Sequence, residues 1–147
     1  MTEDAARSAE SLPRAEFAFP GPLRAQLVAT ILDGSKTSTT SLAIEYEREQ
    51  APLPKVGDRS VLVDSHDRPV AVLEVTGLRV VRLADVDLAH VRSEGEGHQS
   101  LAQWRDSHEH FWTSSQMRAE LGHPDFTVDD ATHVVLERFQ LVTRLLE

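Results

Sequence analysis

A long segment rich in β-branched residues constrains the fold of this chain most. Five of the fourteen residues from 70 to 83 are valine, which favours a strand over a helix. Pro69 opens the segment, and Gly77 lies near its middle, where a glycine predicts a bend or a bulge. The sequence therefore predicts a long strand that bends at Gly77.

A helix and several shorter elements surround this segment. Apolar residues recur at spacings of three and four from Leu23 to Leu32, which predicts one buried helix face ending before Gly34. Two more strands are expected at residues 59–64 and 132–142. Short helices are expected at residues 42–49, 84–93, 100–111 and 113–121. Strands interrupted by short helices are typical of the α+β class, here with a curled or closed sheet covered by helices.

Length and composition favour one domain in a reducing compartment. A chain of 147 residues can form a sizeable core without cross-links, and this one has no cysteine. No apolar run reaches the ~18–20 residues that cross a bilayer, and residues 1–16 lack the apolar stretch of a signal peptide. We therefore expect a disordered tail over residues 1–16, a domain over residues 17–147, no membrane contact and a cytoplasmic location.

Charge limits the kind of ligand. The chain has 24 acidic and 15 basic residues, a net charge of −9, which opposes the broad basic surface that a long polyanion needs. If nucleic acid binds, we expect one or two nucleotides in a pocket, and no DNA partner. Thirteen basic residues are arginine, and only Lys36 and Lys55 are lysine. A buried lysine can act as a base or a point donor, which favours a functional role for Lys36, whereas Lys55 lies beside a turn.

Three spaced motifs together resemble the ASCH domain family, a branch of the PUA-like superfamily, in its longer bacterial form. They are Gly34-Ser35-Lys36-Thr37-Ser38-Thr39 after the first helix, Pro52-Leu53-Pro54-Lys55-Val56-Gly57-Asp58 before a strand, and Glu94-Gly95-Glu96-Gly97 followed by Ser100, Trp104, His108 and Phe111-Trp112. The resemblance runs from about Phe17 to Val142. It implies a small β-barrel with helices packed around it, a cleft facing the lysine loop, and a role with RNA or RNA-derived nucleotides.

The resemblance implies three alternative functions. Members of this size look like RNA-binding or ribonuclease proteins, which favours a metal-independent ribonuclease with a cleft around Lys36. Shorter relatives hydrolyse N4-acetylcytidine with a lysine, a threonine and a glutamate, which correspond here to Lys36, Thr39 and Glu96, with Glu94 as the alternative glutamate. A non-catalytic RNA-binding adaptor is the third. This chain is longer than those hydrolases between the glutamate and the last strand, at residues 99–130, where an insertion can reshape the cleft.

Each hydrolase hypothesis gives these residues different roles. In amide hydrolysis the Thr39 hydroxyl attacks the acyl carbon, and Lys36 activates this hydroxyl. Glu96 orients Lys36 or moves a proton to the leaving amine. Backbone N–H groups with Ser38 or Thr40 then donate to the oxyanion. In RNA cleavage Lys36 contacts the phosphate and Glu96 takes the 2′-hydroxyl proton. The expected substrate-binding residues are Thr37, Ser38, Thr40, Tyr46, Glu94 and Trp112.

Other interpretations of these segments are structural. Without the resemblance, the Ser/Thr-rich stretch from 35 to 41 is typical of a solvated loop whose hydroxyls cap the next helix. Trp104 and Phe111 share a helix stripe that favours the core, whereas Trp112 breaks the stripe and favours a cleft wall. His108 and His110 point about 200° apart on a helix and cannot share a metal there. We expect no metal and no cofactor, and the sequence leaves the oligomeric state open.

Overall fold

The computed structural model describes residues 11–145 and contains one mixed five-stranded sheet. The strands lie in the order β1-β3-β4-β5-β2, and only β1 and β3 pair in parallel. Their bounds are β1 Arg14–Ala15, β2 Ser38–Leu42, β3 Arg59–Val63, β4 Pro69–Arg82 and β5 His133–Arg144. The expected α+β class with a curled sheet is confirmed at this level, although over the described residues the sheet stays open, with β1 and β2 at its edges.

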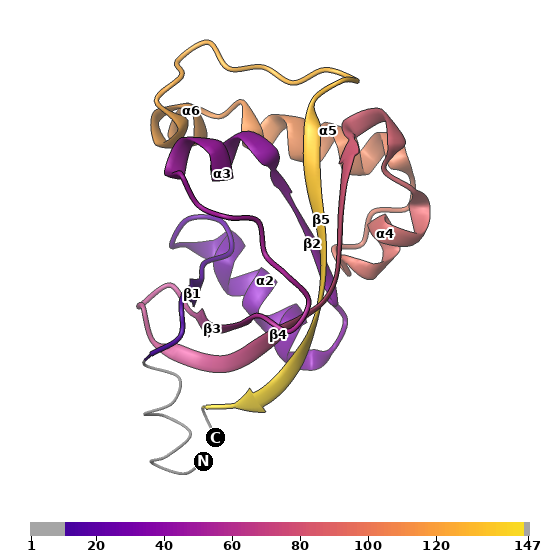
Figure 1. Ribbon diagram of the computed structural model, residues 1–147. Helices are drawn as coiled ribbons and strands as arrows, with labels where there is room; N and C mark the ends of the chain where they lie inside the picture. Colours follow the sequence, from indigo (N-terminus) through magenta and orange to yellow (C-terminus); the bar gives the residue numbers. More distant parts are fainter. Residues whose placement is uncertain (1–10, 146–147) are drawn as a thin grey trace.

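Two long strands form the centre of the molecule (Figure 1). β4 and β5 pair along most of their length, and the pairing register shifts twice, between Val72 and Leu73 and between Val75 and Gly77. The second shift lies at the glycine for which the sequence predicts a bend. Because the bend divides each strand into two parts, the two parts pack against different sets of helices.

The helices cover the two parts of the sheet separately. Their bounds are α2 Pro22–Asp33, α3 Ala43–Glu49, α4 Leu88–Ser93, α5 Leu101–Trp112 and α6 Ser115–Leu121, with a single 3₁₀ turn, η1, at Leu83–Asp85. Helix α2 buries Val28 and Ile31 against Phe139 of β5 in one core, while Trp104 and Trp112 of α5 lie in the other. Figure 1 shows α3, α5 and α6 gathered at one end of the long strands and α2 toward the other.

Two segments differ from the sequence expectation. The stretch expected as a loop contains strand β2, because Ser38–Leu42 pairs with β5 and its threonines tolerate the extended backbone. The helix expected over residues 84–93 is divided at Asp87, whose side chain accepts a hydrogen bond from the His90 amide and caps a new helix. Both segments approach residues 34–37, the loop between α2 and β2 that contains Lys36 and is called the lysine loop below.

The expected tail is partly placed by the structure. Residues 1–10 lie outside the described residues, but β1 within the same predicted tail pairs with β3. The following turn is held by Arg24, a buried side chain of α2 that donates to the carbonyls of Phe17 and Ala18. Residues 11–16 are therefore part of the fold. No helix among the described residues is both long and apolar enough to span a membrane.

Candidate functional site

A cavity of about 660 Å³ opens between the two cores. Its walls come from the N-terminal segment, α2, β2, α3, the start of β3, α5 and β5. Six of the residues singled out in the sequence line it, namely Lys36, Thr39, Thr40, Tyr46, Glu96 and Trp112. The other three do not line it: Ser38 and Glu94 are fully buried, and Thr37 is exposed.

Lys36 is the most deeply placed charge of the cavity wall. Helix α2 ends at Gly34 in the left-handed conformation, and the Lys36 amide then donates to the Thr30 carbonyl before the chain enters β2. The residue is only 2% exposed. Its Nζ lies 3.0 Å from Oε2 of Glu96 and 3.4 Å from the backbone oxygen of Glu94. The lysine is therefore buried with a carboxylate partner, as a buried charge requires.

The turn that carries both glutamates packs directly onto the lysine loop. Gly95 has φ +67°, and a Cβ atom at this position would lie 2.2 Å from the Ser35 carbonyl oxygen. The Thr37 amide also donates to the Ser93 carbonyl at 2.8 Å. Only a glycine permits this backbone approach. It explains how two segments about 60 residues apart hold their charged groups within hydrogen-bond distance.

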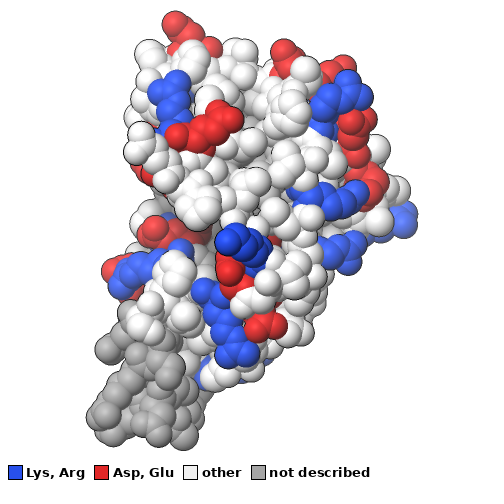
Figure 2. Space-filling view, in the orientation of Figure 1, with Lys and Arg blue, Asp and Glu red and all other residues white. Residues whose placement is uncertain are grey.

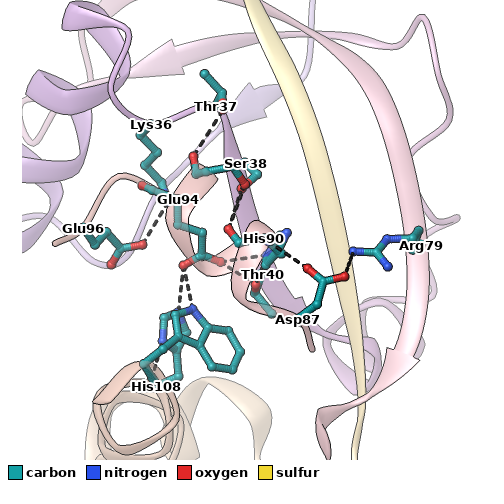
Figure 3. A network of polar contacts seen from close by, with 12 residues as sticks. Lys36, Thr37, Ser38, Thr40, Arg79, Asp87, His90, Glu94, Glu96 and His108 are labelled. Atoms are coloured by element: carbon teal, nitrogen blue, oxygen red, sulfur yellow. Dashed lines mark hydrogen bonds and ion pairs between the residues drawn. The ribbon is translucent and has the colours of Figure 1, made fainter. Parts of the chain in front are cut away.

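Glu94 lies at the centre of a buried polar network (Figure 3). Its Oε1 accepts from Trp104 Nε1 at 2.9 Å, and its Oε2 lies 2.5 Å from Thr40 Oγ1 and 3.0 Å from His90 Nε2. His108 Nε2 approaches Oε1 at 3.4 Å. Burial alone would raise the pKa of Glu94, but the hydrogen bonds from the two histidines and the charge of Lys36 outweigh it. The pKa of Glu94 therefore lies well below its usual range, and this carboxylate stays ionised.

Glu96 and His108 line the cavity, and their pKa values are raised, in contrast to the lowered pKa of Glu94. Burial raises the pKa of Glu96 above its usual value, and the neighbouring Glu94 raises it further, against the lowering effect of Lys36. Burial would lower the pKa of His108, but hydrogen bonding to Glu94 and the charges of both glutamates raise it. Two adjacent carboxyl groups with pKa values pushed apart are typical of acid–base sites. Glu96 is the group suited to carry a proton, and Glu94 the one suited to stay charged.

Strand β2 divides the predicted hydroxyl groups between its two faces. Ser38 Oγ lies 2.5 Å from Ser93 Oγ, and Thr40 donates to Glu94, so both face α4. Since these hydroxyls already bond inside the network, neither is free to donate to an oxyanion in this arrangement. Thr39 lies on the other face and makes no hydrogen bond through its hydroxyl to any described residue.

The remaining predicted residues have mixed placements. The Thr37 hydroxyl donates to the Ser93 carbonyl and joins the lysine loop to α4. Tyr46 reaches back from α3 so that its hydroxyl lies 3.1 Å from Ser41 Oγ. Trp112 lines the cavity but is only 2% exposed and packs edge-on against Trp104, so it serves the core as well as the wall.

The sequence analysis assigned no functional role to two ionisable residues that matter for the cavity, His108 and Glu137. His108 belongs to the third motif, and the structure places its Nδ1 2.9 Å from the Trp104 carbonyl and the residue in the cavity wall. Glu137 lies on β5 directly opposite Thr39 and also lines the cavity. Its signal was present in the sequence, because it interrupts the apolar pattern of the last strand.

The cavity is rich in acidic groups. Its wall contains six carboxyl side chains, from Glu16, Glu45, Glu49, Asp58, Glu96 and Glu137, against three Lys or Arg side chains. Each of these three is paired with a carboxylate: Arg14 with Asp67, Lys36 with Glu96, and Arg59 with Glu74. Figure 2 likewise shows acidic and basic side chains interspersed over one face of the molecule, without a continuous basic surface.

One group of side chains has the composition of a metal site. One ligand atom from each of Glu94, Glu96 and His108 lies within 4.8 Å of the others. The Lys36 ammonium, 3.0 Å from Glu96, already supplies positive charge to these carboxylates. The sequence expectation that the protein uses no metal remains a prediction.

Comparisons with known proteins place this geometry in a family context. Residues 16–143 match the family model of the ASCH domain. The chain is similar to the crystal structure of an ASCH domain from Lactobacillus crispatus, with 26% identity and a TM-score of 0.76, over 97% of this chain and 87% of that one. It is similar in fold to protein EF3133 from Enterococcus faecalis, with 23% identity and a TM-score of 0.70, over 81% of this chain and 68% of that one. No curated protein matches the chain significantly.

Proposed function

Since this chain belongs to the ASCH domain family, we propose that it hydrolyses the amide bond of a small N-acylated nucleoside in the cavity formed around Lys36. The observation that carries the proposal is the charge of the cavity wall. Every Lys or Arg that lines it is already paired with a carboxylate, and carboxyl groups outnumber these cations. An uncharged ligand of nucleoside size suits such a wall.

The same charges argue against the ribonuclease hypothesis as the first choice. A phosphate group is bound by unpaired Arg or Lys side chains or by a helix N-terminus. A ribonuclease using Lys36 would have to break its ion pair with Glu96 and hold an anion beside further carboxylates. The amidohydrolase hypothesis requires only a proton transfer within this pair and brings no anionic substrate into the cavity. RNA cleavage and RNA binding without cleavage are therefore outcomes that the experiment below tests separately.

The chemistry can be assigned to three residues of the wall. Lys36 gives a proton to Glu96, whose raised pKa suits it to accept one, and the neutral amine takes the proton of the Thr39 hydroxyl. Thr39 Oγ1 then bonds to the acyl carbon. As the carbon–nitrogen bond breaks, the leaving nitrogen takes the proton from Lys36. Water hydrolyses the resulting threonine ester, which releases the carboxylic acid and restores Thr39.

The test compares two substrates under one condition. The protein is incubated with EDTA and either N4-acetylcytidine or labelled single-stranded RNA, and the products are separated by chromatography. We expect release of cytidine and acetate, and intact RNA. Lys36→Met and Thr39→Val should each lower turnover by roughly 10²–10⁴-fold, the usual contribution of an acid–base group.

The matched control for Lys36→Met is Lys55→Met, since Lys55 is the only other lysine and is exposed outside the cavity wall. Full activity of Lys36→Met would overturn the proposal. RNA cleavage that depends on Lys36, without cytidine release, would establish the ribonuclease instead. Retention of RNA without turnover of either substrate would leave the adaptor function.

A further inference from the structure

The wall opposite the lysine contains a carboxyl group that the chemistry above does not use. Glu137 of β5 pairs with Thr39 of β2 in the antiparallel register, and both line the cavity. Side chains directly opposite each other in such a pair lie on the same face, with Cβ atoms about 4.5–5.5 Å apart. A ligand whose acyl carbon reaches Thr39 must therefore pass beside Glu137.

Glu137 has no bonding partner among the described residues. No hydrogen bond or ion pair joins its carboxyl group to them, although the residue is only partly exposed. Among the groups near it, Asp58 comes from the turn before β3, the Tyr46 hydroxyl of α3 bonds to Ser41, and the opposite residue, Thr39, makes no hydrogen bond to it. The cavity thus offers this carboxyl group to a ligand.

These neighbours also favour the protonated form of the side chain. Burial raises the pKa of Glu137, and the charge of Asp58 raises it further. A protonated carboxyl group offers one O–H donor and one C=O acceptor side by side. Its complement is a ring nitrogen that accepts a hydrogen bond, next to an exocyclic nitrogen that donates one. Cytosine presents this edge, and N4-acylation leaves one N–H on it.

We propose that Glu137 recognises the base of the substrate by pairing with the ring nitrogen and the adjacent exocyclic N–H of a cytosine-type edge. The inference rests on the proposed function, because the exocyclic nitrogen is the atom released in the amide hydrolysis. Binding this nitrogen at Glu137 sets the attached acyl carbon beside Thr39. Glu137 is thus a specificity residue, and Lys36 and Thr39 carry out the reaction.

Cytidine, the reaction product, is the probe that tests this pairing without turnover. Its affinity is measured by isothermal titration for the wild-type protein, Glu137→Ala, Glu137→Gln and a charge-matched control, Glu47→Ala, which removes an exposed carboxylate of α3 outside the cavity wall. We expect Glu137→Ala to weaken binding roughly 10- to 100-fold, the usual value of a bidentate contact to a base edge. Glu137→Gln, which keeps one donor and one acceptor, should restore most of the loss, and the control should bind like the wild type.

Two further readouts separate recognition from a structural effect. Wild-type affinity should fall as pH rises through the pKa of Glu137, because the ionised carboxylate repels the ring nitrogen, whereas Glu137→Gln should bind independently of pH. 3-Deazacytidine lacks the ring nitrogen, so it should bind to the wild type more weakly than cytidine does. To Glu137→Ala, 3-deazacytidine and cytidine should bind with equal affinity.

Equal cytidine affinity for the wild type and Glu137→Ala, or the absence of cytidine binding, would overturn the inference. Cytidine binding that depends on Glu137 in a protein without amidohydrolase activity would overturn the proposed reaction alone. Amide hydrolysis with an unchanged KM in Glu137→Ala would overturn the role of Glu137 in recognition and leave the proposed reaction standing.

Discussion

Replacing Glu94 by alanine gives the most direct test of how the site is held together. The carboxylate is fully buried and accepts from Trp104 Nε1, while Thr40 and His90 approach its second oxygen within 3.0 Å. Glu94→Ala leaves these three groups without that acceptor and removes a negative charge near Lys36. Breaking a buried ionic contact of this kind costs about 3–5 kcal/mol.

The expected loss is large enough to measure in two ways. For a domain of this size, each 1 kcal/mol lowers Tm by roughly 2–4 °C, so 3–5 kcal/mol corresponds to a decrease of roughly 6–20 °C. Urea denaturation at neutral pH gives the same difference as a free energy of unfolding. Glu94→Gln keeps an acceptor for Trp104 and should lose less, about 1.5–3 kcal/mol, the value of hydrogen bonds to a charged group.

The control is Glu120→Ala, which removes an exposed glutamate of α6 and should change stability by no more than about 0.5 kcal/mol. The pKa of Glu94 is lowered by folding, so its stabilisation is present above the unfolded pKa of about 4.3 and is lost as pH falls toward the folded pKa. The difference between wild type and Glu94→Ala should therefore shrink in acid. A loss below about 1 kcal/mol at neutral pH would refute the reasoning, because removing one member of a buried ionic network leaves its partners uncompensated.

Three other predictions concern the glutamate turn, His108 and the N-terminal segment. Gly95→Ala should lower the free energy of unfolding by clearly more than Gly97→Ala in urea titrations, since both have positive φ but only Gly95 would drive a Cβ into the Ser35 carbonyl. His108→Gln should cost stability at about pH 6 and progressively less toward pH 9, because the raised pKa of His108 gives stabilisation that is present below the unfolded value of about 6.5 and lost through the folded one. Arg24→Met should speed amide hydrogen exchange in residues 14–19, because it removes the donors to two backbone carbonyls there.

The sequence predicted the elements whose signals are local. The helix before Gly34, the bend at Gly77 and the last strand all follow from apolar spacing, β-branched residues and glycine positions, and the structure has them within a few residues. Strand β2 was expected as a loop because its serines and threonines carry no apolar alternation. Its extended form depends on pairing with β5, nearly a hundred residues later in the chain.

The motifs in the sequence were enough to predict several residues of the site, but not which of these residues contact each other. The motifs gave Lys36, Thr39 and Glu96, which line one cavity, and left open which of Glu94 and Glu96 faces it. The structure resolves this choice through the left-handed turn at Gly95, which buries Glu94 and turns Glu96 toward the cavity. The sequence marks Glu137 only as a break in the apolar pattern of the last strand, and its position opposite Thr39 depends on strand register, which the sequence does not show.

The close packing of the glutamate turn on the lysine loop has a consequence for how the protein acquires its site. Lys36 and Glu96 are 60 positions apart, and the chain between them forms β3 and β4. Contacts that close such long stretches of chain form late, because their entropy cost is met only when the intervening sheet is in place. A partly folded chain therefore has a solvated lysine and no cavity. During refolding from denaturant, ligand binding should return only with the slowest phase, after the signals of the individual helices.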